Sequence, residues 1–270
     1  MTATPIGNAR DITLRALDAL AACDAIAAED TRVTSKLLAI HGIARPLFAY
    51  NDHNAAGARP KLLKRLREGQ RIVLVSDAGT PLVSDPGYRL VREALAEGIA
   101  VHALPGPSAL LAALALAGLP TDRFLFAGFL PPKSGARRSA LQEVGDARAT
   151  LIFFESPHRL AESLADMADV LGPRQAAVGR ELTKLHEEMR RGDLPSLASA
   201  YAGETLPRGE ITLVVAPPKE AAPDLARADG LLDKALQFMP VRAASDLLAE
   251  ALDLPRHALY ERALAKRKGA

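Results

Sequence analysis

Short apolar runs of strand length alternate with stretches in which apolar residues recur every three or four positions, almost throughout the chain. This alternation is typical of α/β layering, with helices packed on a largely parallel or mixed sheet. In the first half we expect buried strands at 25–28, 47–50, 72–75 and 101–104, and helices at 14–22, 35–40, 61–67, 88–96 and 109–117.

The cluster Gly-Leu-Pro-Thr-Asp at residues 118–122 marks a break, after which a second alternating block begins. In this block we expect strands at 124–129, 151–154, 176–178 and 211–216, and helices at 138–144, 160–171 and 197–202. Tandem proline at 217–218 ends the block, because proline donates no hydrogen bond to a neighbouring strand.

The last part of the chain has no strand signal, and helices are predicted at 229–238, 243–251 and 256–265. They form either a small helix-turn-helix appendage or an extra helical layer on the second domain. The prediction is therefore an N-terminal α/β domain (1–119), a C-terminal α/β domain (120–218) and a helical tail (219–270) that is a candidate for RNA contact.

The composition is that of a globular protein, with 49% hydrophobic and 24% charged residues among 270. The single cysteine, Cys23, has no partner in the chain, which favours a reducing, cytoplasmic location. No apolar run approaches the roughly 20 residues of a membrane span, and the N-terminus lacks the pattern of a signal peptide. The net charge of +2 averages over local clusters, so it does not exclude a nucleic-acid substrate.

Several familiar sites are excluded by their missing motifs. The glycines are not spaced as in a dinucleotide-binding fingerprint, and the sequences of a P-loop and of a nucleophile elbow are absent. The six histidines lack the spacing of a zinc site, so no metal is expected.

Three loops combine glycine with proline and small polar residues, at 4–8, 76–81 and 104–108. The second and third follow predicted strands, which places them at the strand ends where open α/β sheets bind ligands. The second loop carries Asp77 and no lysine or arginine, so it suits ribose hydroxyls or a cationic ligand better than a polyphosphate. Each loop taken alone is also compatible with a simple tight turn between strand and helix.

Seven motifs, in order along the chain, carry a resemblance to one family. They include Ala-Thr-Pro-Ile-Gly-Asn at 3–8 and Phe-Glu-Ser-Pro-His-Arg at 154–159, with the others at 28–32, 76–87, 105–108, 119–124 and 180–187. The sequence resembles the bacterial methyltransferases that act on a cytidine ribose 2'-hydroxyl of small-subunit ribosomal RNA, a branch of the tetrapyrrole methylase superfamily. The resemblance covers about residues 3–216 and continues more weakly over the tail.

The resemblance implies two α/β domains with S-adenosylmethionine in the cleft between them, a homodimer, and a substrate cytidine in the decoding region of 16S rRNA, as free RNA or in the 30S subunit. It assigns to the donor pocket Pro5, Gly7, Asp77, Gly79, Ser84 and Ser108, with Leu182 and Gly209 closing it from the second domain. Relatives carry a short apolar strand before residues 3–8. Because only Met1 and Thr2 precede that motif here, we expect either a missing first strand or a start recorded too late.

Methyl transfer to a ribose hydroxyl needs alignment with the donor and a group that accepts the hydroxyl proton. Asp30, Glu181 and Glu187 are the candidate acceptors. Lys184 and Arg32 are candidates to orient a phosphate or to stabilise an alkoxide. Glu181 and Lys184 are equally compatible with an ordinary surface ion pair.

Two basic clusters are candidate contacts for RNA phosphates, one at 133–138 and one at 255–270. An exposed loop and a frayed basic terminus would have the same composition. The candidate RNA-binding residues are Arg32, Lys133, Arg137, Arg138, Arg262, Lys266, Arg267 and Lys268. The low aromatic content of 4% favours recognition of RNA shape and backbone over base stacking.

Two other functions remain open on the sequence. A tetrapyrrole C-methyltransferase of the same superfamily would be favoured by a Gly-Pro-Gly type of first loop, whereas this chain has Pro-Ile-Gly-Asn at 5–8. A non-catalytic protein that senses the donor would bind it without transferring a methyl group.

Overall fold

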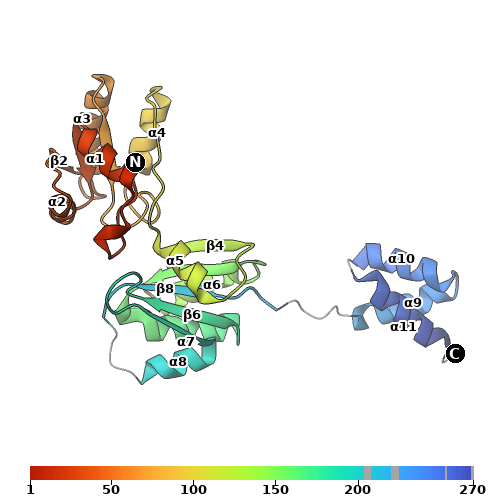
Figure 1. Ribbon diagram of the computed structural model, residues 1–270. Coiled ribbons are helices and arrows are strands. Elements are labelled where there is room, and N and C mark those ends of the chain that lie inside the picture. The colour runs from red at the N-terminus through yellow and green to blue at the C-terminus, as the bar shows by residue number, and fades with distance from the viewer. Residues whose placement is uncertain (204–207, 220–224, 253, 269–270) are drawn as a thin grey trace. The chain divides into compact units, whose positions relative to one another are not determined.

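A computed structural model describes residues 1–203, 208–219, 225–252 and 254–268, with the backbone alone at 226, 227 and 268 (Figure 1). Residues Met1–Pro218 form one compact unit and Lys219–Ala270 form a second. The first unit contains two separate sheets, one on each side of the division predicted at 119/120, which stays a prediction. No helix among these described segments is both long and apolar enough to cross a membrane.

The first sheet is parallel, with strand order β2 (Leu47–Ala49), β1 (Ala25–Ala28) and β3 (Ile72–Val75). All four residues of β1 are buried, as expected of a central parallel strand with helices on its faces. The helices of this half are α1 (Leu14–Ala22), α2 (Thr31–Ile40), α3 (Ala55–Arg67) and α4 (Tyr88–Ala96). Helices α1 and α2 begin at side-chain caps, since the Thr13 hydroxyl accepts from the Ala16 amide at 3.2 Å and Asp30 accepts from the Arg32 amide at 2.8 Å.

The expected vacancy beside β3 is occupied by the first residues of the chain. The Thr2 amide donates to the Leu74 carbonyl at 3.1 Å, and Thr2 pairs in parallel with Leu104. Residues 2 and 4 make isolated bridges and form no strand, so among the described residues no strand precedes the 3–8 motif. The expectation of a buried strand at 101–104 was wrong, because this segment makes a single bridge and His102 and Ala103 are exposed.

The second sheet is mixed, with strand order β4 (Phe124–Phe129), β5 (Thr150–Glu155), β8 (Ile211–Val215), β6 (Gln175–Arg180) and β7 (Glu188–Asp193). Only β4 and β5 run parallel; every other neighbouring pair is antiparallel. Strand β7 was missed by the sequence because Glu-Met-Arg-Arg-Gly-Asp has no apolar pattern, and it forms the edge of the sheet where charged side chains meet solvent.

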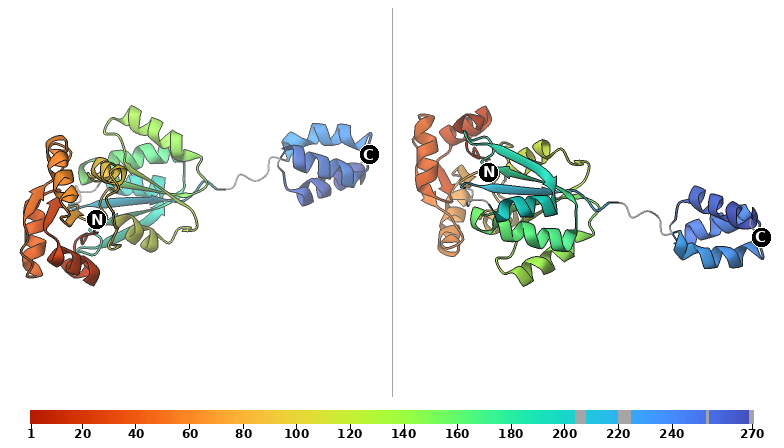
Figure 2. Two further views of the ribbon diagram at one scale, coloured as in Figure 1. Left: turned by 90° about the horizontal axis from the view of Figure 1, so that it is seen from above. Right: turned by 90° about the horizontal axis from the view of Figure 1, so that it is seen from below.

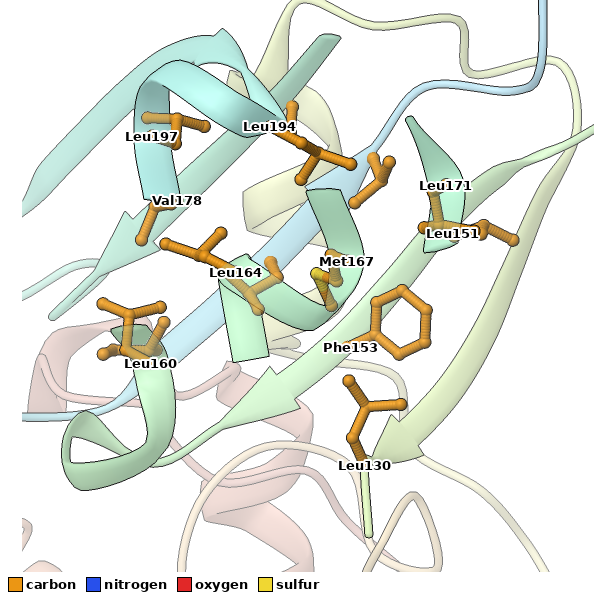
Figure 3. Packing of buried hydrophobic residues seen from close by; sticks show 14 of the residues in the cluster. Leu130, Leu151, Phe153, Leu160, Leu164, Met167, Leu171, Val178, Leu194 and Leu197 are labelled. Carbon is orange, nitrogen blue, oxygen red and sulfur yellow. The ribbon is translucent and has the colours of Figure 1, made fainter. Parts of the chain in front are cut away.

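Helix α5 (Ala109–Ala117) covers one face of this sheet, and α6 (Ser134–Gly145), α7 (Leu160–Leu171) and α8 (Leu194–Ala202) cover the other (Figures 1 and 2). The larger core lies under α6 to α8. Figure 3 shows Leu164 and Met167 of α7 above Leu151 and Phe153 of β5, and each of these side chains is no more than 1% exposed. The α5 face is packed by Ala113, Leu114 and Ala117 against Ile152 and Val214.

The second unit contains α9 (Ala226–Leu236), α10 (Val241–Leu252) and α11 (Arg256–Lys268). These helices share their own core, which includes Leu232, Ala244 and Leu259, each fully buried. The second unit is therefore a small helical domain with its own hydrophobic core.

Candidate functional site

The three glycine-containing loops of the first half meet one another. The Thr4 and Gly79 backbones exchange two hydrogen bonds, at 2.9 and 3.0 Å. The Thr80 hydroxyl donates to the Pro107 carbonyl at 3.4 Å, and a Cβ at Gly106 would lie only 2.9 Å from that of Ala3. The chain thus requires glycine where these backbones approach most closely.

A pocket of about 390 Å³ opens where these loops face the second sheet. Five of the eight predicted donor residues line it: Asp77, Gly79, Ser84, Ser108 and Gly209. Pro5, Gly7 and Leu182 do not line it. Leu182 is 6% exposed and packs with Ile6 in the core under α5, while Ile6 itself reaches the pocket.

Three carboxyl groups gather on the first-half side of the pocket, from Glu29, Asp77 and Asp85. Burial raises the pKa of all three, and for Asp85 burial, with the charges of Glu29 and Asp77 adding to it, raises the pKa to about 6. Asp77 is held in place because its Oδ1 accepts from the Asp30 amide at 2.9 Å. A cationic ligand would relieve the repulsion among these carboxylates.

The second sheet supplies an apolar and aromatic wall. Phe129 and Phe154 line the pocket with their ring centroids 5.6 Å apart. Glu155 follows at the end of β5 and its side chain is fully buried. Its carboxylate accepts from Ser163 at 2.6 Å and from the Ser156 amide at 2.7 Å, and it pairs with Arg159 at 2.6 Å. This network fixes the backbone at Ser156, which also lines the pocket.

Two loops beside the pocket carry backbone strain. The non-glycine residues with positive φ in the described part of the chain are Leu82, Ser84, Glu181 and Thr183, with φ between 51° and 75°. Thr183 is β-branched, so its left-handed conformation is especially costly. Strain of this kind persists only where surrounding contacts hold it. The 82–84 loop lies close to the second sheet, because a Cβ at Gly128 would lie 3.5 Å from the Ser84 hydroxyl.

The structure brings together Glu181 and Lys184 from the predicted catalytic set and adds Glu210. The ammonium Nζ of Lys184 donates to Glu181 Oε1 at 2.7 Å and to Glu210 Oε2 at 3.0 Å. Although burial opposes it, hydrogen bonding within this cluster lowers the pKa of Glu181 and raises that of Lys184. Glu210 lines the pocket, so Lys184 lies at its rim.

The other two candidate proton acceptors are used locally. Arg32 forms hydrogen bonds with Asp30 and pairs with it at 2.6 Å, which lowers the pKa of Asp30 to about 2. Glu187 accepts from the Thr183 amide at 2.6 Å and so stabilises the strained loop before it. Neither carboxyl lines the pocket, and the lowered pKa of Asp30 makes that carboxyl a weak base.

Arg137 corrects the expectation of a phosphate contact at 133–138. Its side chain is 2% exposed and pairs with Asp166 at 2.6 Å, with Glu162 at 3.4 Å. It is buried because α6 packs against α7, and helical periodicity turns residue 137 toward that interface. Lys133 is exposed at the start of α6, and Arg138 pairs with Asp169 at 2.7 Å.

The basic tail is largely neutralised by acids of α9. Arg262 pairs with Asp229 at 2.6 Å, and Lys266 pairs with Asp233 at 2.8 Å. Hydrogen bonding from Arg262 lowers the pKa of Asp229 to about 2. Arg267 is exposed, and the side chain of Lys268 lies outside the described residues. A sequence window confined to 255–270 could not reveal acids that come from a different helix.

Sequence reasoning missed Glu29, Asp85, Glu155 and Glu210 as pocket residues. Glu29, Asp85 and Glu155 lie inside quoted motifs, and the available signal was the position of Glu29 and Glu155 at the ends of strands. For Glu210 the family resemblance had already placed residues 209–210 at the closing side of the pocket, without a role for the carboxyl group. In the described ranges 1–203, 208–219, 225–252 and 254–268, His, Cys, Asp and Glu side chains form no group of three that would hold a metal ion.

The fold and the pocket agree with comparisons to known proteins. The family model described as Tetrapyrrole (Corrin/Porphyrin) Methylases matches residues 3–198, and that described as RsmI C-terminal HTH domain matches residues 217–267. A crystal structure of uroporphyrin-III C-methyl transferase from Thermus thermophilus, complexed with S-adenyl homocysteine, superposes with a TM-score of 0.54 at 18% identity, over 79% of this chain and 95% of that one. These matches define the class as that of the tetrapyrrole methylase fold.

Closer relatives specify the family. A protein of Mesorhizobium japonicum named ribosomal RNA small subunit methyltransferase I is 54% identical over 98% of this chain and 90% of its own length. A protein of the same name from Escherichia coli O157:H7 is 49% identical over 97% of this chain and 92% of its own length. The chain belongs to the ribosomal RNA small subunit methyltransferase I family.

Proposed function

We propose that the chain transfers a methyl group from S-adenosylmethionine to the ribose 2'-hydroxyl of a cytidine in the decoding region of 16S rRNA. The acid-lined pocket of about 390 Å³ carries the proposal for the donor. Small-subunit ribosomal RNA as the substrate is supported by the names of the relatives. The cytidine, its 2'-hydroxyl and the decoding region rest on the ordered motifs quoted above.

The residues of the pocket fit this donor. S-adenosylmethionine supplies a methyl group activated by a sulfonium, and it also carries an ammonium, a ribose and an adenine. Glu29, Asp77 and Asp85 offer carboxylates to its positive charges and ribose hydroxyls, and the wall around Phe129 and Phe154 offers apolar surface to its base. The described residues that line the pocket include no lysine or arginine, and a polyphosphate would need such residues.

The chain contributes mainly alignment, a sheltered site and a fixed cation. Ordering two reactants in a productive geometry lowers a barrier by roughly 7–11 kcal/mol at best. Lys184 at the rim of the pocket would orient a phosphate of the RNA or stabilise the developing alkoxide, because Glu181 and Glu210 hold its ammonium in place. The lowered pKa of Glu181 makes it a positioning residue for Lys184 and a poor acceptor of the hydroxyl proton. As the ribose oxygen bonds to the methyl carbon, the carbon–sulfur bond breaks, S-adenosylhomocysteine leaves and the hydroxyl proton is released to water.

The test is incubation of the purified protein and methyl-labelled donor with 30S subunits, naked 16S RNA and a tetrapyrrole precursor. Label in RNA is expected, and label in the tetrapyrrole alone would overturn the proposal. Donor binding without any transfer would favour the sensing protein instead. Lys184→Ala is expected to abolish transfer and to retain donor binding by calorimetry, whereas Lys36→Ala, on the exposed side of α2, is expected to behave as wild type.

We also infer a homodimer in the cytoplasm, from the family resemblance and from the single buried cysteine. Sedimentation equilibrium of the full chain tests the dimer directly. A mass equal to one chain at micromolar concentration would contradict it.

A further inference from the structure

We propose that a groove between β2 and α3 is a second contact site for RNA, which holds the sugar–phosphate backbone of a single-stranded segment. We call it the β2–α3 groove; it is lined by Phe48, His53, Gly57, Lys61 and Arg65, with neighbouring apolar atoms. This proposal rests on the proposed function in that it assigns RNA as the ligand. It lies outside the donor pocket, with which it shares no lining residue.

The groove concentrates positive charge that the structure leaves unused. Helix α3 carries five basic residues and no acid. Three of them are committed elsewhere: Arg59 pairs with Glu93, Lys64 with Glu68 and Arg67 with Glu97. The remaining two, Lys61 and Arg65, point into the groove and have no carboxylate partner within the described part of the chain. Cations without a local counterion attract phosphates.

Arg65 carries an unpaired donor beside the groove. Its Nη1 atom is buried and has no hydrogen-bond partner among the described residues. A buried donor of this kind is costly unless it is satisfied, and a guanidinium presents a fork that matches phosphate oxygens. None of the described residues that line the groove is an Asp or a Glu, so no carboxylate of this lining competes for that position.

An aromatic ring lies beside the cation. The guanidinium carbon of Arg65 is 4.3 Å from the centroid of the Phe48 ring, and Phe48 is 38% exposed. RNA-binding proteins use aromatic rings and guanidinium planes as stacking surfaces for unpaired bases. The groove, of about 570 Å³, therefore has the parts to hold one phosphate and the base beside it. A second copy of this chain would have to supply acidic side chains to fit equally well.

The experiment uses the full-length protein and two independent changes. The double variant Lys61→Ala/Arg65→Gln removes the free charges. Gly57→Glu introduces a carboxylate where a Cβ meets no atom within 4 Å and the backbone is unstrained, so it fills the groove without disturbing the fold. Lys64→Ala is the matched control, because Lys64 lies on the same helix with a 75% exposed side chain outside the groove.

Affinity for a fluorescent single-stranded RNA and for 30S subunits is measured against salt concentration. Both test variants are expected to bind RNA roughly tenfold or more weakly. The salt slope of the double variant is expected to fall by about 0.7, for the one phosphate that the groove would hold. The donor affinity and the thermal midpoint of both test variants are expected to stay at the wild-type values. Lys64→Ala is expected to match the wild type in RNA affinity, salt slope, donor affinity and thermal midpoint.

Wild-type RNA affinity and salt slope in the double variant would overturn the proposal. A shift in oligomeric state with RNA affinity retained would overturn it too and would make the groove a subunit interface. The proposed function is tested separately from the groove, because methyl transfer by the wild-type protein decides it. A wild-type protein that binds RNA through this groove but transfers no methyl group would support the groove and contradict the proposed activity.

Discussion

The side chain of Lys184 lies across the backbone of Gly7, so closely that a Cβ at Gly7 would overlap the lysine stem and lie 2.8 Å from its Cε. This contact joins the first loop of the chain to the loop that follows β6. It explains why Gly7, which does not line the pocket, belongs to the site: it leaves room for the lysine that Glu181 and Glu210 hold at the rim.

Gly7→Ala tests this relationship. The backbone at Gly7 does not require glycine, so the methyl group acts only by displacing Lys184 from its two carboxylates. We expect transfer to slow by about tenfold or more, because displacement by 1 Å can cost 10²-fold, with the thermal midpoint nearly unchanged. The control is Gly135→Ala in α6, where a Cβ meets nothing. Equal turnover in the two variants would contradict the role given to this contact.

The affinity for the donor is expected to depend on pH through Asp85. Its pKa in the free protein is about 6, and a cationic donor prefers the ionised form. At pH 5 only about one tenth of a group with this pKa is ionised, so affinity is expected to rise roughly tenfold from pH 5 to pH 7 and then to level off.

Titration calorimetry with S-adenosylmethionine across this range measures the effect. Asp85→Asn is expected to bind more weakly at pH 7 and to lose most of the pH dependence. Asp122→Asn, in the exposed turn after α5, is expected to follow the wild-type curve. A wild-type affinity that falls between pH 5 and pH 7 would show that Asp85 acts in its neutral form.

Removing Arg137 is expected to destabilise the fold and not to weaken RNA binding. Arg137→Ala leaves the Asp166 carboxylate, which is 10% exposed, without its closest cation, at a cost of about 3–5 kcal/mol in the free energy of unfolding. Arg138→Ala is the control and is expected to cost under about 1 kcal/mol, since its side chain is 40% exposed. Urea unfolding at pH 7 measures both.

The stability lost in Arg137→Ala is expected to depend on pH. Burial raises the pKa of Asp166, but hydrogen bonds from Arg137 and Ser134 outweigh burial and lower this pKa below its value in the unfolded chain. The contribution of this ion pair is therefore present above the unfolded pKa and is lost as the pH falls through the folded one. The gap between wild type and Arg137→Ala should narrow below about pH 4. A gap that widens on acidification would contradict the pairing.

Thr183→Gly is expected to stabilise the protein and to slow the reaction. Threonine here has φ of 67°, and its hydroxyl is buried without a partner in the described structure. Glycine relieves both costs, but its backbone loses more conformational entropy on folding than threonine does, so the net gain is up to about 1 kcal/mol. Turnover is expected to drop because the loop then holds Lys184 less rigidly. Thr121→Gly, whose backbone is not left-handed, is expected to bring no gain in stability.

The regular elements could largely be predicted because periodicity reports burial. Helices 14–22, 88–96, 109–117 and 160–171 and strands 25–28, 72–75 and 124–129 have the predicted bounds. Strand β7 and the segment at 101–104 show the limit of this signal. In β7 pairing overrides a polar sequence, and at 101–104 apolar residues lack a neighbouring strand long enough to pair with.

The site was predictable as a set of loops but not as a set of contacts. The loops that carry Asp77 and Ser108 were identified because they follow strand-like segments, and the family resemblance assigned these two residues to the donor pocket, which they do line. Arg137 was misassigned because a window of charges cannot tell a buried face of a helix from an exposed one. The free cations of α3 were overlooked because the sequence does not show which basic residues of a helix form ion pairs. The structure shows that three of the five do and, among the described residues, leaves the other two free.

The most direct test of the central claim is the chemical identity of the methylated product. After incubation with methyl-labelled donor and 30S subunits, the 16S RNA is digested to nucleosides and separated by liquid chromatography with mass detection. The account predicts label in 2'-O-methylcytidine from wild-type protein and none from Lys184→Ala. Label on a base, or label confined to a tetrapyrrole acceptor, would contradict it.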